Sequence, residues 1–153
     1  MQLKRVLFVD DSARDAELAL EAFGEYRLCN EVIVVRDGVE ALDYLYRRGE
    51  FAGREDDQPS LVLLDLKMPR LNGIDVLKQI KGDPAMKAIP VVIMTSSREE
   101  QDLSACYQLG VNAYVVKPVK FQSFVEAVRQ LGMFWMMINE PPPAAMMRPP
   151  PSG

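Results

Sequence analysis

Histidine is absent from the 153-residue sequence, and many kinds of catalytic site depend on it. Without an imidazole the chain cannot build a Ser-His-Asp or Cys-His site or the HExxH zinc motif. It also cannot carry a phosphohistidine of its own. Any chemistry must therefore run on carboxylates, hydroxyls and amines.

Cysteine and long apolar runs are also scarce. Cys29 and Cys106 lie far apart and outside any metal-ligand spacing, so we expect buried thiols rather than a disulfide framework or a zinc site. Lys4 and Arg5 precede only four apolar residues, too few for a signal peptide, and no run reaches the roughly 18 residues of a membrane span. These absences predict a cytoplasmic protein without a membrane partner.

An excess of positive charge is missing as well. The 18 basic and 22 acidic side chains give a formal net charge of -4 and are mixed along most of the chain, which excludes nucleic acid as an expected partner. With 48% hydrophobic residues the chain is long enough for one well-buried core and too short for two ordinary domains.

Short apolar runs alternate with amphipathic segments along the chain. The runs are rich in Val, Ile and Leu and lie near residues 5–9, 31–35, 61–64, 91–94 and 113–116. Continuous apolar runs of this length are typical of parallel strands buried on both faces. Parallel strands need crossover helices, so the alternation predicts an α/β fold: a doubly wound, five-stranded parallel sheet of flavodoxin-like order 2-1-3-4-5 in a single domain.

The segments between the runs have the helical period. One apolar face is expected in each, at Ala16, Ala19, Leu20 and Phe23, at Val39, Leu42, Leu45 and Tyr46, at Ile74, Leu77 and Ile80, and at Leu103, Cys106 and Leu109. Ser12 and Asp37 are expected to cap the first two helices, and Gly24 and Gly49 to follow them. A fifth helix is expected from Phe121.

Two regions depart from the alternation. The connection 49–60 is longer than usual for such turns, and we expect an ordered or half-ordered surface loop. Near the other end, "MFWMMI" from Met133 is apolar on every side, and residues 141–153 contain six prolines. We therefore predict a domain over residues 1–139 and a Pro-rich, extended or disordered tail over residues 140–153.

Acidic residues follow two of the predicted strands. Asp10 and Asp11 end the first and Asp65 ends the third, and these strands are neighbours in the order 2-1-3-4-5. Three adjacent carboxylates repel one another unless a cation is present, and an open oxygen cluster suits Mg²⁺ that keeps several waters. Thr95 and Lys117 end strands on the same edge, which adds a hydroxyl and an amine. This set is suited to phosphoryl transfer, with a carboxylate as the nucleophile.

These motifs together resemble the receiver domain of bacterial response regulators. The similarity covers residues 4–132 and rests on "VDD", "LLDLKMPRLNG", "MTS" and "AYVVKP". Thr95 follows Asp65 by 30 residues and Lys117 follows it by 52, and both spacings fit the family. The resemblance implies that Asp65 accepts a phosphoryl group from a sensor histidine kinase.

The resemblance also implies roles for the residues around Asp65. Mg²⁺ would be held by Asp11, Asp65 and the backbone carbonyl of Lys67, with Asp10 acting through water. The contacts to the phosphoryl group, and the conformational change that follows phosphorylation, would involve Thr95, Ser96, Lys117 and Tyr114. The peptide before Pro118 would be cis. An alternative for Tyr114 is a fixed, buried ring.

A second resemblance is to stand-alone receivers that pair with phytochromes. It rests on the long loop 49–60, on "RDGVEALDYL", and on an aromatic end with "FW" followed by "NEPPP". It implies a homodimer formed through the C-terminal part. The apolar stripe Phe134, Trp135, Met136 and Met137 is then a candidate dimer surface, although a buried helix end is the alternative.

Other functions stay open on this architecture. A haloacid-dehalogenase-like phosphatase also uses an aspartyl nucleophile with Mg²⁺, but it needs an acid two residues later, where this chain has Lys67. A dinucleotide or flavin site would need GxGxxG after the first strand, where "DDSARD" stands instead. A docking module that is not phosphorylated is a further alternative. A receiver would only accept and slowly lose its own phosphoryl group, so it would not be an enzyme on external substrates.

Overall fold

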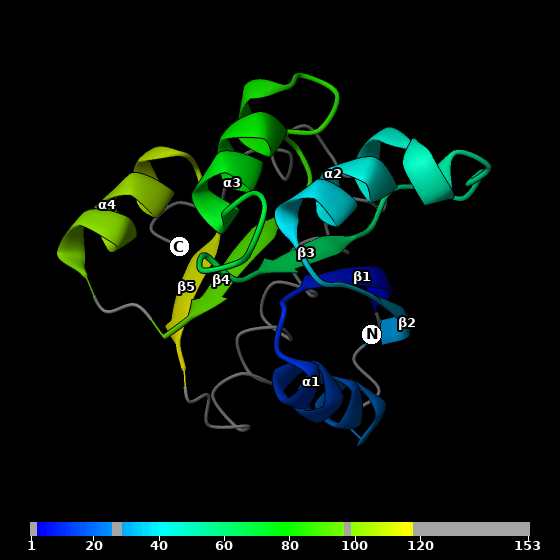
Figure 1. Ribbon diagram of the computed structural model, residues 1–153, viewed down its shortest axis with the longest axis horizontal. Helices are drawn as coiled ribbons and strands as arrows, with labels where there is room; N and C mark the ends of the chain where they lie inside the picture. The colour runs from blue at the N-terminus through cyan, green and yellow to red at the C-terminus, as the bar shows by residue number, and fades with distance from the viewer. Residues whose placement is uncertain (1–2, 26–28, 97–98, 118–153) are drawn as a thin grey trace, which may run out of the picture.

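The sheet has the predicted order. The computed structural model describes residues 3–25, 29–96 and 99–117. Its strands are all parallel and run in the order β2-β1-β3-β4-β5 (Figure 1). They are β1 (Leu3–Val9), β2 (Cys29–Val35), β3 (Leu61–Leu64), β4 (Val91–Thr95) and β5 (Ala113–Val116). The predicted doubly wound, flavodoxin-like fold class is confirmed.

Helices cover both faces of this sheet. They are α1 (Ala13–Glu25), α2 (Gly38–Tyr46), α3 (Gly73–Gly82) and α4 (Glu100–Gln108), with a short 3₁₀ turn η1 (Gly49–Phe51). Helices α2 and α3 lie on one face together with α4, and α1 lies on the other (Figure 1). The helix predicted from Phe121 falls outside the described residues. Within the described part of the chain, no helix is both long and apolar enough to cross a bilayer.

The apolar runs supply both faces of the core. In β1, Leu7 and Val9 pack with residues of α2, α3 and α4, whereas Val6 and Phe8 pack with α1. Alternate side chains of a strand point to opposite faces, so a strand covered on both sides must be apolar at every position. This requirement explains the continuous apolar runs, and it leaves the strand ends as the places where polar side chains can gather.

Both predicted helix starts match the structure, as does Gly49 after the end of α2, whereas Gly24 does not. Ser12 and Asp37 accept hydrogen bonds from the N–H groups of Asp15 and Glu40, so both cap helices as predicted. The prediction for Gly24 was wrong, because α1 continues through it to Glu25 with the backbone outside the left-handed region. Buried Phe23 packs the last turn on the sheet and explains why the helix does not end there.

Among the helices that the structure describes, α4 has the weakest apolar face. Cys106 is buried, but Leu103 is 38% exposed and Leu109 lies just past the end of the helix. The predicted face of this helix therefore buries Cys106 as expected and leaves Leu103 facing water. The side chain of Cys29 lies outside what the structure describes.

Burial makes Cys106 an inert thiol. Burial and the nearby charge of Asp102 raise the pKa of the Cys106 thiol to about 11. We expect native Cys106 to resist alkylation by iodoacetamide at pH 8 and to react fully in urea, as measured by peptide mass mapping. The folded thiol keeps its proton to higher pH than the unfolded one. The free energy of unfolding therefore falls as pH rises from the pKa of the unfolded thiol toward about 11. Rapid native alkylation would contradict the packing of α4.

The long connection 49–60 is tied down by Arg54. The Arg54 guanidinium lies 4.0 Å from the centre of the Tyr44 ring, donates to the Tyr44 carbonyl and reaches the side-chain oxygen of Gln58. Its side chain is only 7% exposed. The loop is therefore an ordered strap on α2, in agreement with the first of the two expected forms.

We predict that Arg54→Ala destabilises the protein. The substitution removes a shielded cation–π contact and several charge-assisted hydrogen bonds, at a cost of about 2–3 kcal/mol in the free energy of unfolding. Urea denaturation measures the change. Arg48→Ala is the matched control, since its side chain is 58% exposed and its ion pair with Asp43 is expected to contribute less than about 1 kcal/mol. Equal losses in the two variants would contradict the role of Arg54 as an anchor.

Candidate functional site

Strand pairing sets the positions of the acidic residues. Val9 of β1 is paired with Leu64 of β3, so the next residue of each strand, Asp10 and Asp65, lies at the same edge. The N–H of Asp65 donates to the carbonyl of Val9 at 3.0 Å, and the N–H of Asp10 donates to that of Val35 at 3.1 Å. Three neighbouring backbones therefore hold these two carboxylates at the carboxyl end of the sheet.

Three carboxylates converge at this edge. Oxygen atoms of Asp10, Asp11 and Asp65 lie within 4.8 Å of one another. Asp10 and Asp65 are buried and Asp11 is exposed. Burial raises the pKa of Asp10, and the charge of Asp65 adds to this, although Lys117 and the N–H of Ser12 act in the other direction. A hard cation with oxygen ligands fits this donor set, because it would offset the repulsion and keep an open face toward water.

Lys117 brings a positive charge to the same point. Its N–H donates to the carbonyl of Thr95 at 2.8 Å, which extends the pairing of β4 and β5 by one residue. Its Nζ lies 2.6 Å from Asp10 Oδ2 and 3.5 Å from Asp65 Oδ2. Although burial acts against the charge, hydrogen bonds to Asp10 and Asp15 raise the pKa of Lys117 above its ordinary value. The side chain is an ammonium at any physiological pH.

Asp15 is a contact of Lys117 that the sequence did not single out. Its Oδ2 lies 2.7 Å from Lys117 Nζ, nearly as close as Asp10 Oδ2 at 2.6 Å. In the sequence, "SARD" has the form of an ordinary helix start, in which an acid three residues after the cap is favourable. Only the position of Lys117 distinguishes this acid from a helix-start residue.

The hydroxyl and aromatic residues lie on β4, β5 and the turn after β4. Thr95 is fully buried at the end of β4, and Ser96 follows it as an exposed residue. Tyr114 pairs with Ile93 in the register of β4 and β5, and its half-buried ring packs against the cluster under α3 and α4. Thr95 and Tyr114 thus lie on the same face of the sheet, toward α4. Pro118 and the stripe Phe134, Trp135, Met136 and Met137 lie outside the described residues.

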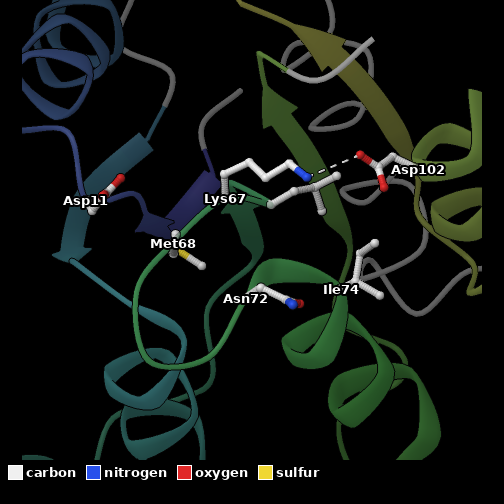
Figure 2. A pocket seen from close by; sticks show the side chains of 7 residues that line it. Asp11, Lys67, Met68, Asn72, Ile74 and Asp102 are labelled. Atoms are coloured by element: carbon white, nitrogen blue, oxygen red, sulfur yellow. Dashed lines mark ion pairs between the residues drawn. The ribbon is translucent and has the colours of Figure 1, made fainter. Parts of the chain in front are cut away.

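A cleft of about 450 Å³ opens beside the carboxylates. Its lining comes from Asp11 after β1, from the loop after β3, from the start of α3 and from α4 (Figure 2). Lys67 extends across it, and its Nζ lies 3.7 Å from Asp102 Oδ2 (Figure 2). The lining residues are Asp11, Leu66, Lys67, Met68, Asn72, Ile74 and Asp102. The cleft leaves the exposed carboxylate of Asp11 open to water.

The loop after β3 is held in shape by charge and by close packing. Arg70 has a left-handed backbone with φ 65°, and its guanidinium pairs with the buried carboxylate of Asp37 at 2.7–2.9 Å. Burial acts to raise the pKa of Asp37, but the N–H of Glu40 and Arg70 together hold it below its ordinary value. The N–H of Gly73 donates to the carbonyl of Leu66 at 2.9 Å, which closes the loop. Lys67 is therefore carried by a fixed turn.

Comparisons with known proteins agree with this geometry. Residues 6–129 match the family model described as the response regulator receiver domain. The response regulator Rcp1 of Synechocystis sp. is 37% identical over 133 residues, which are 87% of this chain and 89% of Rcp1. A structure of Rcp1 in its Mn²⁺-bound form superposes with a TM-score of 0.74 over 86% of this chain and 94% of that one.

Two further solved structures are similar over most of the chain. The bacteriophytochrome response regulator RtBRR is 54% identical, with a TM-score of 0.78 over 95% of this chain and 88% of that one. The phosphorylated cyanobacterial phytochrome response regulator RcpA is 38% identical, with a TM-score of 0.75 over 87% of this chain and 94% of that one. Phytochrome-associated regulators are thus among its relatives. The chain belongs to the response regulator receiver domain family, whose members are signalling proteins.

Proposed function

We propose that this protein is a phosphorylatable switch of a two-component phosphorelay, which accepts a phosphoryl group on Asp65 from a sensor histidine kinase. The observation that supports this is the meeting of three carboxylate oxygens within 4.8 Å and an ammonium 3.5 Å from Asp65. A nucleophilic carboxylate, a cation site and a fixed positive charge are the groups that phosphoryl transfer requires.

In the proposed reaction a carboxylate oxygen of Asp65 forms the new bond to phosphorus. The phosphorus–nitrogen bond to the kinase imidazole breaks, and its electron pair stays on the imidazole. Asp11, Asp65 and the carbonyl of Lys67 would hold Mg²⁺, and Asp10 would act through water. Bound Mg²⁺ would neutralise charge on the carboxylates and on the phosphoryl oxygens.

The remaining site residues would contact the phosphoryl group and respond to it. Lys117 would pair with its oxygens, and Thr95 would donate a hydrogen bond, with Ser96 beside it. Tyr114 would respond to the movement of Thr95, since both lie on the face toward α4. A change at Asp65 would in this way reach the outer surface of α4 and β5. We also propose that the peptide bond before Pro118 is cis.

The partner we propose is a phytochrome-type sensor kinase. The names of RtBRR and RcpA support this, because both are phytochrome response regulators. We further propose a receiver over residues 1–139, a Pro-rich tail over residues 140–153, and a cytoplasmic homodimer formed through the C-terminal part. Its proposed contact surface is Phe134, Trp135, Met136 and Met137.

The protein is proposed not to act on external substrates. A haloacid-dehalogenase-like phosphatase would carry an acid where Lys67 stands, and the Lys67 ammonium faces Asp102 of α4. A phosphatase would hydrolyse many equivalents of p-nitrophenyl phosphate. We expect the receiver instead to take up a single phosphoryl group and lose it slowly.

The experiment is phosphorylation of the full chain by acetyl phosphate, followed by intact mass. With Mg²⁺ we expect a gain of one phosphoryl group, and after removal of the metal by EDTA we expect none, because the crowded carboxylates then repel the phosphoryl anion. Addition of Mg²⁺ in excess of EDTA is the control and must restore the gain. To test the partner, phosphorylated phytochrome kinases and unrelated kinases then replace acetyl phosphate as the phosphoryl donor, and the mass gain is measured again. A protein that gains no mass under any of these conditions is a docking module and not a switch.

A further inference from the structure

Asp15 lies in the first turn of α1, but its side chain does not take part in the helix cap. Ser12 caps the helix, and its Oγ accepts from the N–H of Asp15 at 3.2 Å. In the usual reciprocal cap, an acid at this position would accept the N–H of the capping residue in return. Here the N–H of Ser12 donates to Asp10 Oδ1 at 2.9 Å instead. Asp10 takes the place in the cap that Asp15 would fill, and the Asp15 carboxylate reaches Lys117.

The ammonium of Lys117 is closer to Asp15 than to the proposed phosphoryl acceptor. Its Nζ lies 2.7 Å from Asp15 Oδ2 and 3.5 Å from Asp65 Oδ2. The first distance is that of a strong charge-assisted hydrogen bond, and the second is at the limit of one. The side chain of Lys117 is 15% exposed and that of Asp15 is 32% exposed, so water screens this pair less than a surface ion pair.

A phosphoryl group on Asp65 would require a new partner for its oxygens. Lys117 has three ammonium protons. Two of them are directed to Asp10 and Asp15, and only a long contact of 3.5 Å is made to Asp65. Asp10 belongs to the carboxylate cluster that fits a metal, whereas Asp15 is not part of that cluster. Asp15 is therefore the contact that Lys117 can give up without disturbing the cation site.

We propose that Asp15 is a positioning residue that competes with the phosphoryl group for the ammonium of Lys117. This inference rests on the proposed function of Asp65. In the unphosphorylated protein Asp15 binds the ammonium of Lys117 and keeps it beside Asp65. On phosphorylation the ammonium transfers its hydrogen bond from Asp15 Oδ2 to a phosphoryl oxygen, and no covalent bond changes. Asp15 sets how readily the protein enters and leaves the phosphorylated state.

Beryllofluoride binding to the full chain tests this competition. With Mg²⁺, beryllofluoride imitates an aspartyl phosphate, and calorimetry gives its affinity. We expect Asp15→Asn to raise the affinity about three- to tenfold, the range of one partly shielded ion pair. Glu17→Gln removes an exposed acid from the same helix and is expected to leave the affinity unchanged. Asp15→Glu keeps the charge and should stay close to the wild-type protein.

A double-mutant cycle and an NMR signal separate competition from simple charge removal. If Asp15 acts through Lys117, the gain from Asp15→Asn disappears in a Lys117→Ala background. In the unliganded protein, the side-chain ¹⁵N signal of Lys117 should shift in Asp15→Asn and not in Glu17→Gln. An unchanged affinity in Asp15→Asn, or a gain that persists without Lys117, would overturn the competition alone. A wild-type protein that binds no beryllofluoride would overturn the proposed function, and the competition with it.

Discussion

Asp65→Asn is expected to lose the ability to take up a phosphoryl group from acetyl phosphate, with no detectable mass gain in the presence of Mg²⁺. An amide nitrogen or oxygen cannot replace the carboxylate as a nucleophile. Asparagine has nearly the same size and still accepts a hydrogen bond, so the fold should be retained. Removing one of three crowded carboxylates should even stabilise the metal-free protein.

The control for this variant is Asp75→Asn. Asp75 is an exposed acid in the first turn of α3, a short distance along the same chain segment. Its replacement changes the net charge by the same amount and should leave the mass gain intact. If Asp65→Asn were phosphorylated as well as the wild-type protein, the acceptor would have to be another residue.

Gly73→Ala is expected to destabilise the fold strongly. A Cβ at this position would lie 2.2 Å from the carbonyl oxygen of Asp65 and 2.7 Å from the Cα of Leu66. These are backbone atoms that strand pairing holds in place, so neither side can move cheaply. We expect a loss of about 3 kcal/mol or more in the free energy of unfolding, together with slower phosphorylation, because any relaxation displaces Asp65.

Gly82→Ala provides the comparison within the same helix. A Cβ at the end of α3 would have no atom within 4 Å, so the substitution should be neutral or slightly stabilising. Urea denaturation of both variants measures the difference. A Gly73→Ala protein as stable as the wild type would show that the loop after β3 adapts freely, against the tight closure described for it.

The fold could be predicted because the sequence clearly alternates continuous apolar runs with segments of helical period. Strands buried on both faces must be apolar throughout, and α1 to α3 keep clear apolar faces. The helix ends were harder to predict. Gly24 has the composition of a helix end, but the packing of Phe23 carries α1 beyond it. In α4 the exposed Leu103 shows that a weak apolar period does not fix which face is buried.

The acidic and basic groups at the strand ends were predictable for a related reason. A residue that directly follows a strand of known order can be placed at one edge of the sheet, which was enough to bring Asp10, Asp65 and Lys117 together. Two ion pairs could not be placed in this way: Lys117 with Asp15, and Arg70 with Asp37. They depend on the side-chain conformations of residues in a helix or a loop. Their sequence patterns are those of ordinary caps and turns, so only the three-dimensional structure reveals them.

Chemical mapping of the phosphorylated residue is the most direct test of the proposed switch. Borodeuteride reduces an acyl phosphate to an alcohol, so an aspartyl phosphate becomes deuterium-labelled homoserine that peptide sequencing by mass spectrometry can locate. After reaction with acetyl phosphate and Mg²⁺, we predict labelled homoserine at position 65 alone. Label at Asp10, Asp11 or Asp15, or a phosphoryl group that survives reduction on a hydroxyl residue, would contradict the assignment of Asp65 as the acceptor.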